Sequence, residues 1–74
     1  MTDFIALHPH DGGLFRAPGA FRFVRRGADG STVVLVEETA GDIGARAGPT
    51  HPRWAWALDQ GLNELHVRLE LRRA

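Results

Sequence analysis

The histidines of this chain are spaced in a way that suggests metal binding. His8 and His10 stand two apart with Asp11 next to them, while His51 and His66 lie far away in the sequence. Zinc takes three or four such ligands in a tetrahedral shell, and a small fold could bring them together. A His-x-His pair alone does not fix the remaining ligands, and turn or surface histidines beside prolines are the more ordinary interpretation. We therefore predict no metal site and no cofactor, and keep a metal-binding protein as an alternative.

Nucleophilic and acid–base catalysis find little support in the residue types. The chain has no cysteine, and its one serine, Ser31, follows Gly30 in a predicted turn rather than on a nucleophile elbow. Glu37 and Glu38 are adjacent on a predicted strand, so their side chains point to opposite faces and cannot share a proton. The glycines at 41 and 44 lack the Gly-Lys-Ser/Thr ending of a phosphate loop. We predict a protein that is not an enzyme, with an enzyme built at a subunit interface as an alternative.

Arginines interleaved with aromatic residues are the feature with the clearest functional meaning. Such a pattern on a sheet can stack single-stranded bases, and the same residue types dominate protein–protein hot spots. We expect Phe21 and Phe23 to lie in the core, with arginines at its rim. The residues that we single out for partner binding are Arg22, Arg25, Arg26, Arg53, Trp54 and Trp56.

Charge and composition narrow the classes of partner. Nine acidic residues balance nine basic ones, all arginine, so the formal net charge is zero, which argues against a general polyanion binder. Near-neutral proteins tend to associate, which favours a homo-oligomer. No apolar run approaches the ~20 residues of a membrane span, and Asp3 stands where a signal peptide carries bases. Together with the missing cysteines, these features predict a cytoplasmic chain without membrane contact.

The elements that must position these residues are short strands. Residues 4–8 predict a strand, 10–13 a turn and 14–16 a brief extended piece. Residues 20–26 and 32–39 predict a hairpin, closed by a type I′ turn at Asp29 and Gly30. The register that follows pairs Arg22 with Glu37, Phe23 with Val36, Val24 with Leu35 and Arg26 with Val33. Because residues 33–36 are all apolar, the second strand should lie centrally in its sheet.

The rest of the chain completes one small domain of 74 residues. Residues 40–50 predict a glycine-rich loop. Residues 51–62 are compatible with a strand, although Pro52 and Gly61 favour a short helix over 52–60. Residues 64–72 alternate between apolar and charged, which indicates a half-buried strand. The fold class predicted for residues 1–74 is mainly β: a small barrel or a curved antiparallel sheet of four to five short strands.

These observations predict a small non-catalytic protein-interaction module that self-associates, such as an adaptor, a regulator or an inhibitor. A single-stranded nucleic-acid-binding module that uses the arginine–aromatic strand is the first alternative, although the charge balance disfavours it. The metal-binding protein or interface-built enzyme that uses histidines is the second alternative.

Overall fold

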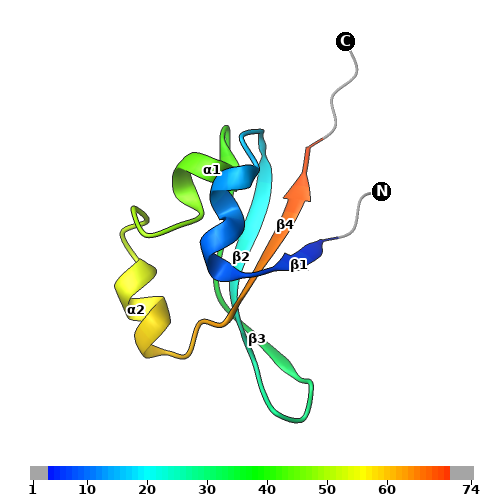
Figure 1. Cartoon of the computed structure of the whole chain (residues 1–74), viewed down its shortest axis with the longest axis vertical. Helices are drawn as coiled ribbons and strands as arrows, with labels where there is room; N and C mark the ends of the chain where they lie inside the picture. The colour runs from blue at the N-terminus through cyan, green and yellow to red at the C-terminus, as the bar shows by residue number, and fades with distance from the viewer. Residues whose placement is uncertain (1–3, 71–74) are drawn as a thin grey trace.

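The computed structural model of the protein describes residues 4–70, which form an antiparallel sheet with short helices packed on it (Figure 1). In chain order the elements are β1 (Ile5–Leu7), the 3₁₀ helix η1 (Pro9–Leu14), β2 (Gly19–Arg26), β3 (Thr32–Ala40), α1 (Ile43–Arg46), α2 (Trp54–Asp59) and β4 (Glu64–Leu69). The order of the four strands is β1-β4-β2-β3, and the two outer strands do not pair with each other. The mainly β fold is therefore confirmed as an open, curved sheet rather than a barrel.

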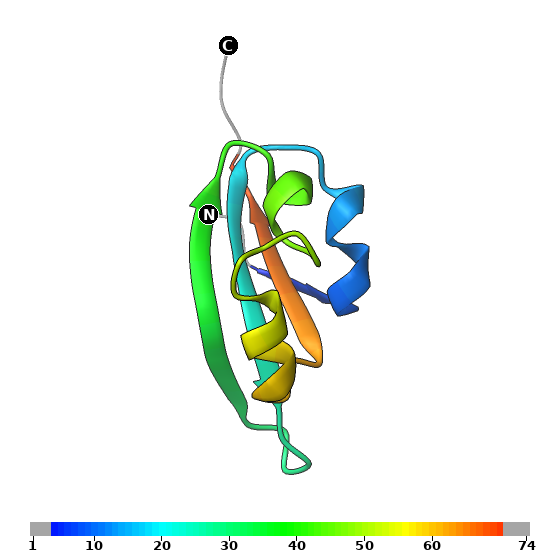
Figure 2. The same cartoon turned by 90° about the vertical axis from the view of Figure 1, so that its left-hand side faces the viewer.

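The helices all lie on one face of the sheet, as Figure 2 shows. The hydrophobic core lies between these helices and the sheet. The alternation predicted for the last strand is confirmed over β4, where Leu65 and Val67 are buried and His66 and Arg68 lie on the opposite face. Within residues 4–70 no helix covers that opposite face, which we call the open face. The buried cluster consists of Phe21, Phe23, Ile43, Ala47, Trp54, Ala57, Leu62, Leu65 and Val67.

The turn of the β2–β3 hairpin differs from the prediction. The Gly27 N–H donates to the Ser31 carbonyl at 2.8 Å, and the Gly30 N–H donates to the Gly27 carbonyl at 3.0 Å. Gly30 has a φ of +88°, whereas Asp29 does not adopt a positive φ. This is the three-residue loop of a type I turn followed by a left-handed glycine, so the type I′ prediction is wrong. The Asp29 carboxylate favours this turn because it accepts both the backbone N–H and the hydroxyl of Ser31.

The register of this hairpin is correct at one end and shifted at the other. Arg22 faces Glu37 and Phe23 faces Val36 as predicted, whereas Val24 faces Val34 and Arg26 faces Thr32, not Leu35 and Val33. The turn contains one residue more than predicted, which shifts the pairs near it by one position. A bulge at Leu35 then shifts the pairing back. The shift caused by the turn and the shift caused by the bulge therefore cancel, and the pairing is as predicted from Val36 onward.

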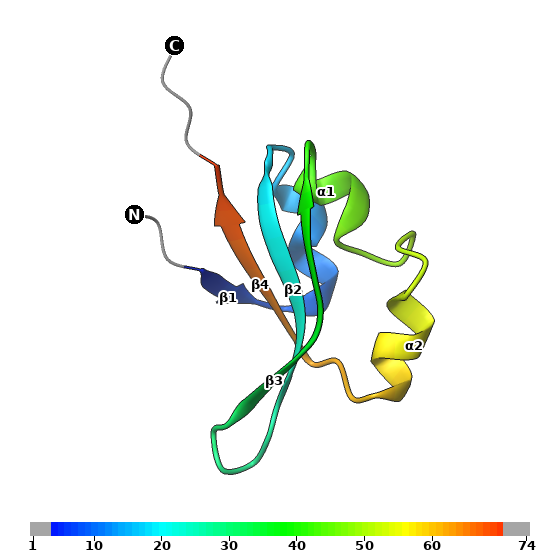
Figure 3. The ribbon, with the colours of Figure 1, turned by 180° about the vertical axis from the view of Figure 1, so that it is seen from behind.

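The prediction that this second strand lies centrally is wrong. Among the described residues β3 pairs with β2 alone and forms one edge of the sheet. β4 pairs with β2 only as far as Val24 and Glu64, so the end of the hairpin projects beyond the sheet as a two-stranded arm (Figure 3). The apolar run of β3 is typical of a strand in the interior of a sheet, whereas among the described residues β3 has one neighbour.

Other segments also depart from the sequence-based expectations. Residues 9–14 form η1 instead of a turn and an extended piece. The predicted loop after β3 contains α1, because Ile43 is fully buried in the core. The helix favoured over 52–60 is confirmed as α2. The last strand is described through Leu69, and residues 71 and 72 of the prediction lie outside the described range. No described helix has the length and apolar character needed to span a membrane.

Candidate functional site

The outer face of α2 presents an exposed tryptophan with an arginine stacked on it. The helix buries Trp54 and Ala57, while Trp56 faces outward and is 42% exposed. The guanidinium carbon of Arg53 lies 4.2 Å from the centre of the Trp56 ring. Residues three apart on a helix are neighbours, and an arginine over an indole face is a favourable cation–π pair. We call Arg53 and Trp56 the α2 patch.

The second tryptophan singled out from the sequence belongs to the core. Trp54 is only 8% exposed. Its ring meets the ring of Phe23 edge-to-face at 5.5 Å and that of His10 at 5.4 Å. Because α2 is a helix and not a strand, Trp54 and Trp56 point to different sides of it. Trp54 therefore positions α2 on the sheet and offers little surface to a partner.

The two phenylalanines of β2 are fully buried, as expected from the sequence. Phe21 and Phe23 face the helices and make edge-to-face contacts with the ring of His51. Their ring faces are covered by other side chains, so they provide no platform on which bases could stack. The aromatic residues of β2 are therefore buried on one face, and none of its arginines has an exposed phenylalanine ring of β2 beside it.

Arg22 lies on the open face, where its charge is compensated within the chain. Its guanidinium forms an ion pair with the carboxylate of Glu37 and stacks 3.8 Å from the centre of the Phe4 ring. Arg68 lies over the same ring at 4.9 Å. The sequence pattern around Phe4 indicates only a short strand and gives no sign that this ring lies beside two arginines.

Arg26 also lies on the open face and holds the base of the hairpin arm. Its Nε and Nη2 donate to the two Glu64 carboxylate oxygens at 2.7 and 2.8 Å. Hydrogen bonds from Arg26 and, to a lesser extent, from His66 lower the pKa of Glu64 to about 2. The side-chain amide of Asn63 accepts from the Arg26 N–H at 2.8 Å and donates to its carbonyl at 3.1 Å. Arg26 is thus committed to contacts inside the chain.

Arg25 points to the helix side of β2 and packs its stem beside Gly61, just after α2. It is exposed and forms no ion pair with any residue of the described range. The six residues predicted to bind a partner therefore fall in four places. Arg22 and Arg26 lie on the open face, Arg25 lies at the end of α2, Trp54 lies in the core, and Arg53 with Trp56 forms the α2 patch.

A buried polar cluster that sequence analysis missed lies beneath the helices. The side chain of His51 is 2% exposed, its Nδ1 accepts the Arg53 N–H at 3.0 Å, and its Nε2 lies 3.1 Å from a Glu38 oxygen. Arg46 donates to both oxygens of the same carboxylate at 2.8 and 3.1 Å. Hydrogen bonding from Arg46 and then from His51 lowers the pKa of Glu38. Glu38 shares the strand face of Val36, and an acid on a core face is the signal that could have revealed this cluster.

The four histidines do not gather. His8 and His10 stack on each other in the η1 region, His51 lies in the core and His66 lies on the open face. Within residues 4–70 no three histidine, aspartate or glutamate side chains are arranged to hold a metal ion. The hydroxyl of Ser31 donates to the Asp29 carboxylate at 2.7 Å in the hairpin turn.

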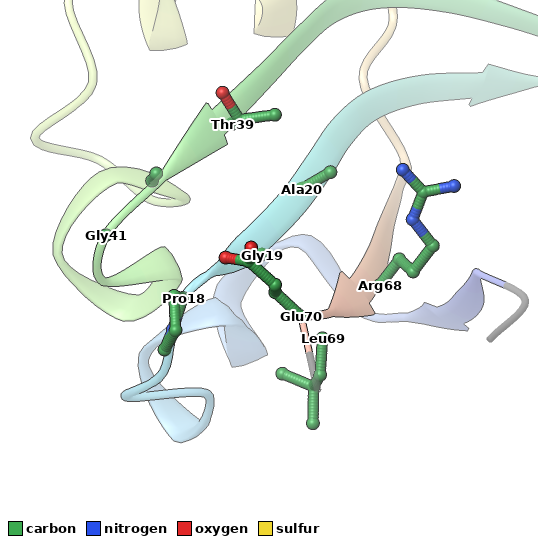
Figure 4. A pocket seen from close by; sticks show the side chains of 9 residues that line it. Pro18, Gly19, Ala20, Thr39, Gly41, Arg68, Leu69 and Glu70 are labelled. Atoms are coloured by element: carbon green, nitrogen blue, oxygen red, sulfur yellow. The ribbon is translucent and has the colours of Figure 1, made fainter. Parts of the chain in front are cut away.

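A shallow pocket of about 530 Å³ opens on the open face at the end of the sheet opposite the hairpin (Figure 4). It forms because Ala20, on the open face, is small where β2 runs between Thr39 and Arg68. The pocket brings together no nucleophile with a histidine base, so it offers a place for a side chain or small polar group rather than a catalytic arrangement.

No protein-family model matches the chain, and comparisons with curated proteins and with solved structures find no match.

Proposed function

We propose that the protein is a non-catalytic protein-interaction module, an adaptor, regulator or inhibitor, that binds a protein partner through the α2 patch and also self-associates. The observation that supports this proposal is that Trp56 is 42% exposed and that its ring lies beneath the guanidinium of Arg53. Tryptophan and arginine are the residues most enriched in protein–protein hot spots. A stacked guanidinium is also partly ordered before a partner arrives, which lowers the entropic cost of binding.

The remaining arginines explain why the proposal is confined to this patch. Arg22 and Arg26 are neutralised by Glu37 and Glu64, and a partner would have to break those ion pairs to use them. Arg53 makes no ion pair in the described range, so its guanidinium remains available to a carboxylate or carbonyl of a partner. The proposed partner therefore presents an apolar side chain for Trp56 beside an acidic or carbonyl group for Arg53.

Nucleic acid is a weaker candidate for the partner. A strand-binding surface needs arginines that neutralise phosphates and aromatic faces that stack bases. The arginines of β2 are largely compensated, and Phe21 and Phe23 are buried. We retain the cytoplasm as the proposed compartment, on the grounds of the cysteine-free composition.

The test compares the proteins retained by immobilised wild-type protein with those retained by Trp56→Ala and Arg53→Ala. Replacing a hot-spot tryptophan costs about 2 kcal/mol of binding free energy or more, which is roughly a thirtyfold loss of affinity. Both substitutions are on exposed side chains, so circular dichroism and the melting temperature should stay close to wild type. Leu14→Ala is the matched control, because Leu14 is an exposed apolar residue at the last position of η1 and not on α2.

The supporting result is a set of proteins retained by wild type and by Leu14→Ala but lost with Trp56→Ala. Identical sets for wild type and both α2-patch variants would reject this patch as the contact. Binding of a single-stranded oligonucleotide that weakens steeply with added salt would favour the nucleic-acid alternative instead.

A further inference from the structure

β3 combines the side-chain pattern of a central strand with the position of an edge strand. Val33 points to the helix side and is 43% exposed, while Val34 points to the open face and is 49% exposed. An uninterrupted apolar run is typical of a strand that is buried on both faces, as in the interior of a covered sheet. An exposed edge with unpaired backbone groups and apolar side chains is also a template for pairing with another chain.

The two halves of the β3 edge differ in whether they carry features that discourage pairing with another strand. Beyond the bulge at Leu35 the strand carries Glu37 and Glu38, and both a bulge and charges discourage pairing at an edge. The half next to the turn, residues 32–34, carries no charge, no proline and no bulge. Pairing with another strand is therefore open to the turn-proximal half only.

We propose that Thr32–Val34 of one molecule pairs antiparallel with the same segment of a second copy, about a two-fold axis at Val33. This inference rests on the self-association proposed above and specifies its surface. The paired edges join two sheets into one, and each β3 then has neighbours on both sides. The proposed contact uses residues 32–34 of β3, and neither residue of the α2 patch belongs to this segment.

The hydrogen-bond pattern of the hairpin defines the register. The Gly27 N–H donates to the Ser31 carbonyl, and backbone groups alternate in direction along an antiparallel strand. The backbone groups of Val33 therefore point towards β2, whereas those of Thr32 and Val34 point away from the sheet. With the axis at Val33, Thr32 of each molecule exchanges hydrogen bonds with Val34 of the other. The two Val33 side chains then meet in a non-hydrogen-bonded pair, where Cα atoms approach to about 4.5 Å.

A second copy suits this edge better than an unrelated strand. An isologous contact needs a segment that complements itself, and the uncharged Thr-Val-Val segment places no like charges opposite each other. The zero net charge of the chain removes long-range repulsion between copies. The paired segment is short, so the interface belongs to the small, weak class, and we expect a dissociation constant of about 10 μM to 1 mM.

The first experiment is sedimentation equilibrium of the full chain from about 10 μM to 1 mM, because association shifts with concentration by mass action. The average mass should rise above 8.1 kDa at the upper end. Val34→Lys should remain monomeric with an unchanged circular dichroism spectrum, since lysine on an edge opposes pairing. Leu14→Lys, which places the same charge on exposed η1, should associate as wild type does.

Hydrogen exchange of individual backbone amides tests the register. The outward N–H groups of Thr32 and Val34 should exchange fast in dilute protein and slow down at about 1 mM protein, by about twofold for a dissociation constant of 1 mM and by roughly fifteenfold for one of 10 μM. A wild-type chain that stays monomeric over the whole range overturns both the self-association and this contact. A dimer that survives Val34→Lys without protecting these two amides overturns the β3 contact alone. Protection of them by a strand of another protein, with no self-association, would assign the edge to that partner instead.

Discussion

Nε2 of His51 lies 3.1 Å from Oε1 of Glu38, and this contact ties the edge strand β3 to the segment that leads into α2. Because Nδ1 of the same ring accepts the Arg53 N–H, the neutral imidazole carries its proton on Nε2 and donates it to the carboxylate. Arg46 of α1 donates to the same carboxylate. One acid on β3 thus fixes both α-helices relative to the sheet, including the helix that carries the α2 patch.

Replacement of Glu38 should therefore destabilise the fold. Glu38→Ala leaves the buried N–H of His51 without its acceptor, which costs about 1–3 kcal/mol of the free energy of unfolding. Glu38→Gln keeps a carbonyl acceptor and should cost less. Urea denaturation measures both. The control is Glu37→Ala on the same strand, whose exposed ion pair with Arg22 should contribute about 1 kcal/mol or less. Equal losses for positions 37 and 38 would contradict the structural role of Glu38.

Acid should weaken the fold through Glu64. Hydrogen bonds from Arg26 and, to a lesser extent, from His66 lower the pKa of this carboxyl from 4.5 to about 2. A carboxyl whose pKa is lower in the folded chain stabilises it above the unfolded pKa, and this contribution disappears as the pH falls through the folded pKa. The free energy of unfolding should therefore decline between about pH 4.5 and pH 2, and the lowered pKa of Glu38 acts in the same direction.

Urea denaturation at a series of pH values measures this decline, and Glu64→Gln should make it shallower. Nuclear magnetic resonance titration of the Glu64 carboxyl gives its pKa directly. A Glu64 pKa near the ordinary value, or an unchanged pH profile for the variant, would show that the pair with Arg26 does not persist in solution.

The sequence was most informative where burial alone determines the structure. The alternation of residues 64–69 outweighed the helix-forming tendency of Leu, Glu and Arg, because only a strand places Leu65 and Val67 together on the core. The helix at 54–59 likewise follows from Trp54 and Ala57, which a helix can bury on one side. The Arg22–Glu37 pair was found because the register error at the turn was cancelled by the bulge.

The features that the sequence did not reveal depend on contacts between distant segments. An Asp-Gly pair is compatible with a type I′ turn and with a type I turn followed by a left-handed glycine. The hydrogen bonds that Asp29 accepts from Ser31 favour the second of these turns. The edge position of β3 depends on β4 returning to the other side of β2, which local periodicity does not encode. The separation of Trp56 from Trp54 follows only once the segment is known to be a helix, so the α2 patch could not be distinguished from core beforehand.

Asn63 should control the order of the hairpin arm. Its side-chain amide bonds both the N–H and the carbonyl of Arg26, so it extends the β4 side of the ladder by one residue. Asn63→Ala removes both hydrogen bonds and should lower the free energy of unfolding by about 1–2 kcal/mol. The amides of residues 26–32 should also exchange faster, because an isolated two-stranded ribbon is only marginally stable. Gln60→Ala, a nearby exposed amide, is the control and should leave exchange in the arm unchanged.

Gly12 and Gly13 should respond very differently to the same substitution. A Cβ on Gly12 would lie 2.1 Å from the carbonyl oxygen of Ala47, whereas a Cβ on Gly13 would meet nothing within 4 Å. Neither glycine has a positive φ, so the difference between them is steric. Gly12→Ala should push η1 away from α1 and cost about 1–3 kcal/mol, as overpacking does elsewhere. Gly13→Ala should be neutral or slightly stabilising, because alanine restricts the unfolded chain.

Thermal denaturation separates these two outcomes, since 1 kcal/mol shifts the melting temperature of a domain this small by about 4–8 °C. Displacement of α1 should also move Arg46 from Glu38, so that the losses for Gly12→Ala and Glu38→Ala combine to less than their sum. Equal melting temperatures for Gly12→Ala and Gly13→Ala would contradict the close contact between η1 and α1. Strictly additive losses of unfolding free energy in the variant with both Gly12→Ala and Glu38→Ala would show that this contact does not hold Arg46 against β3.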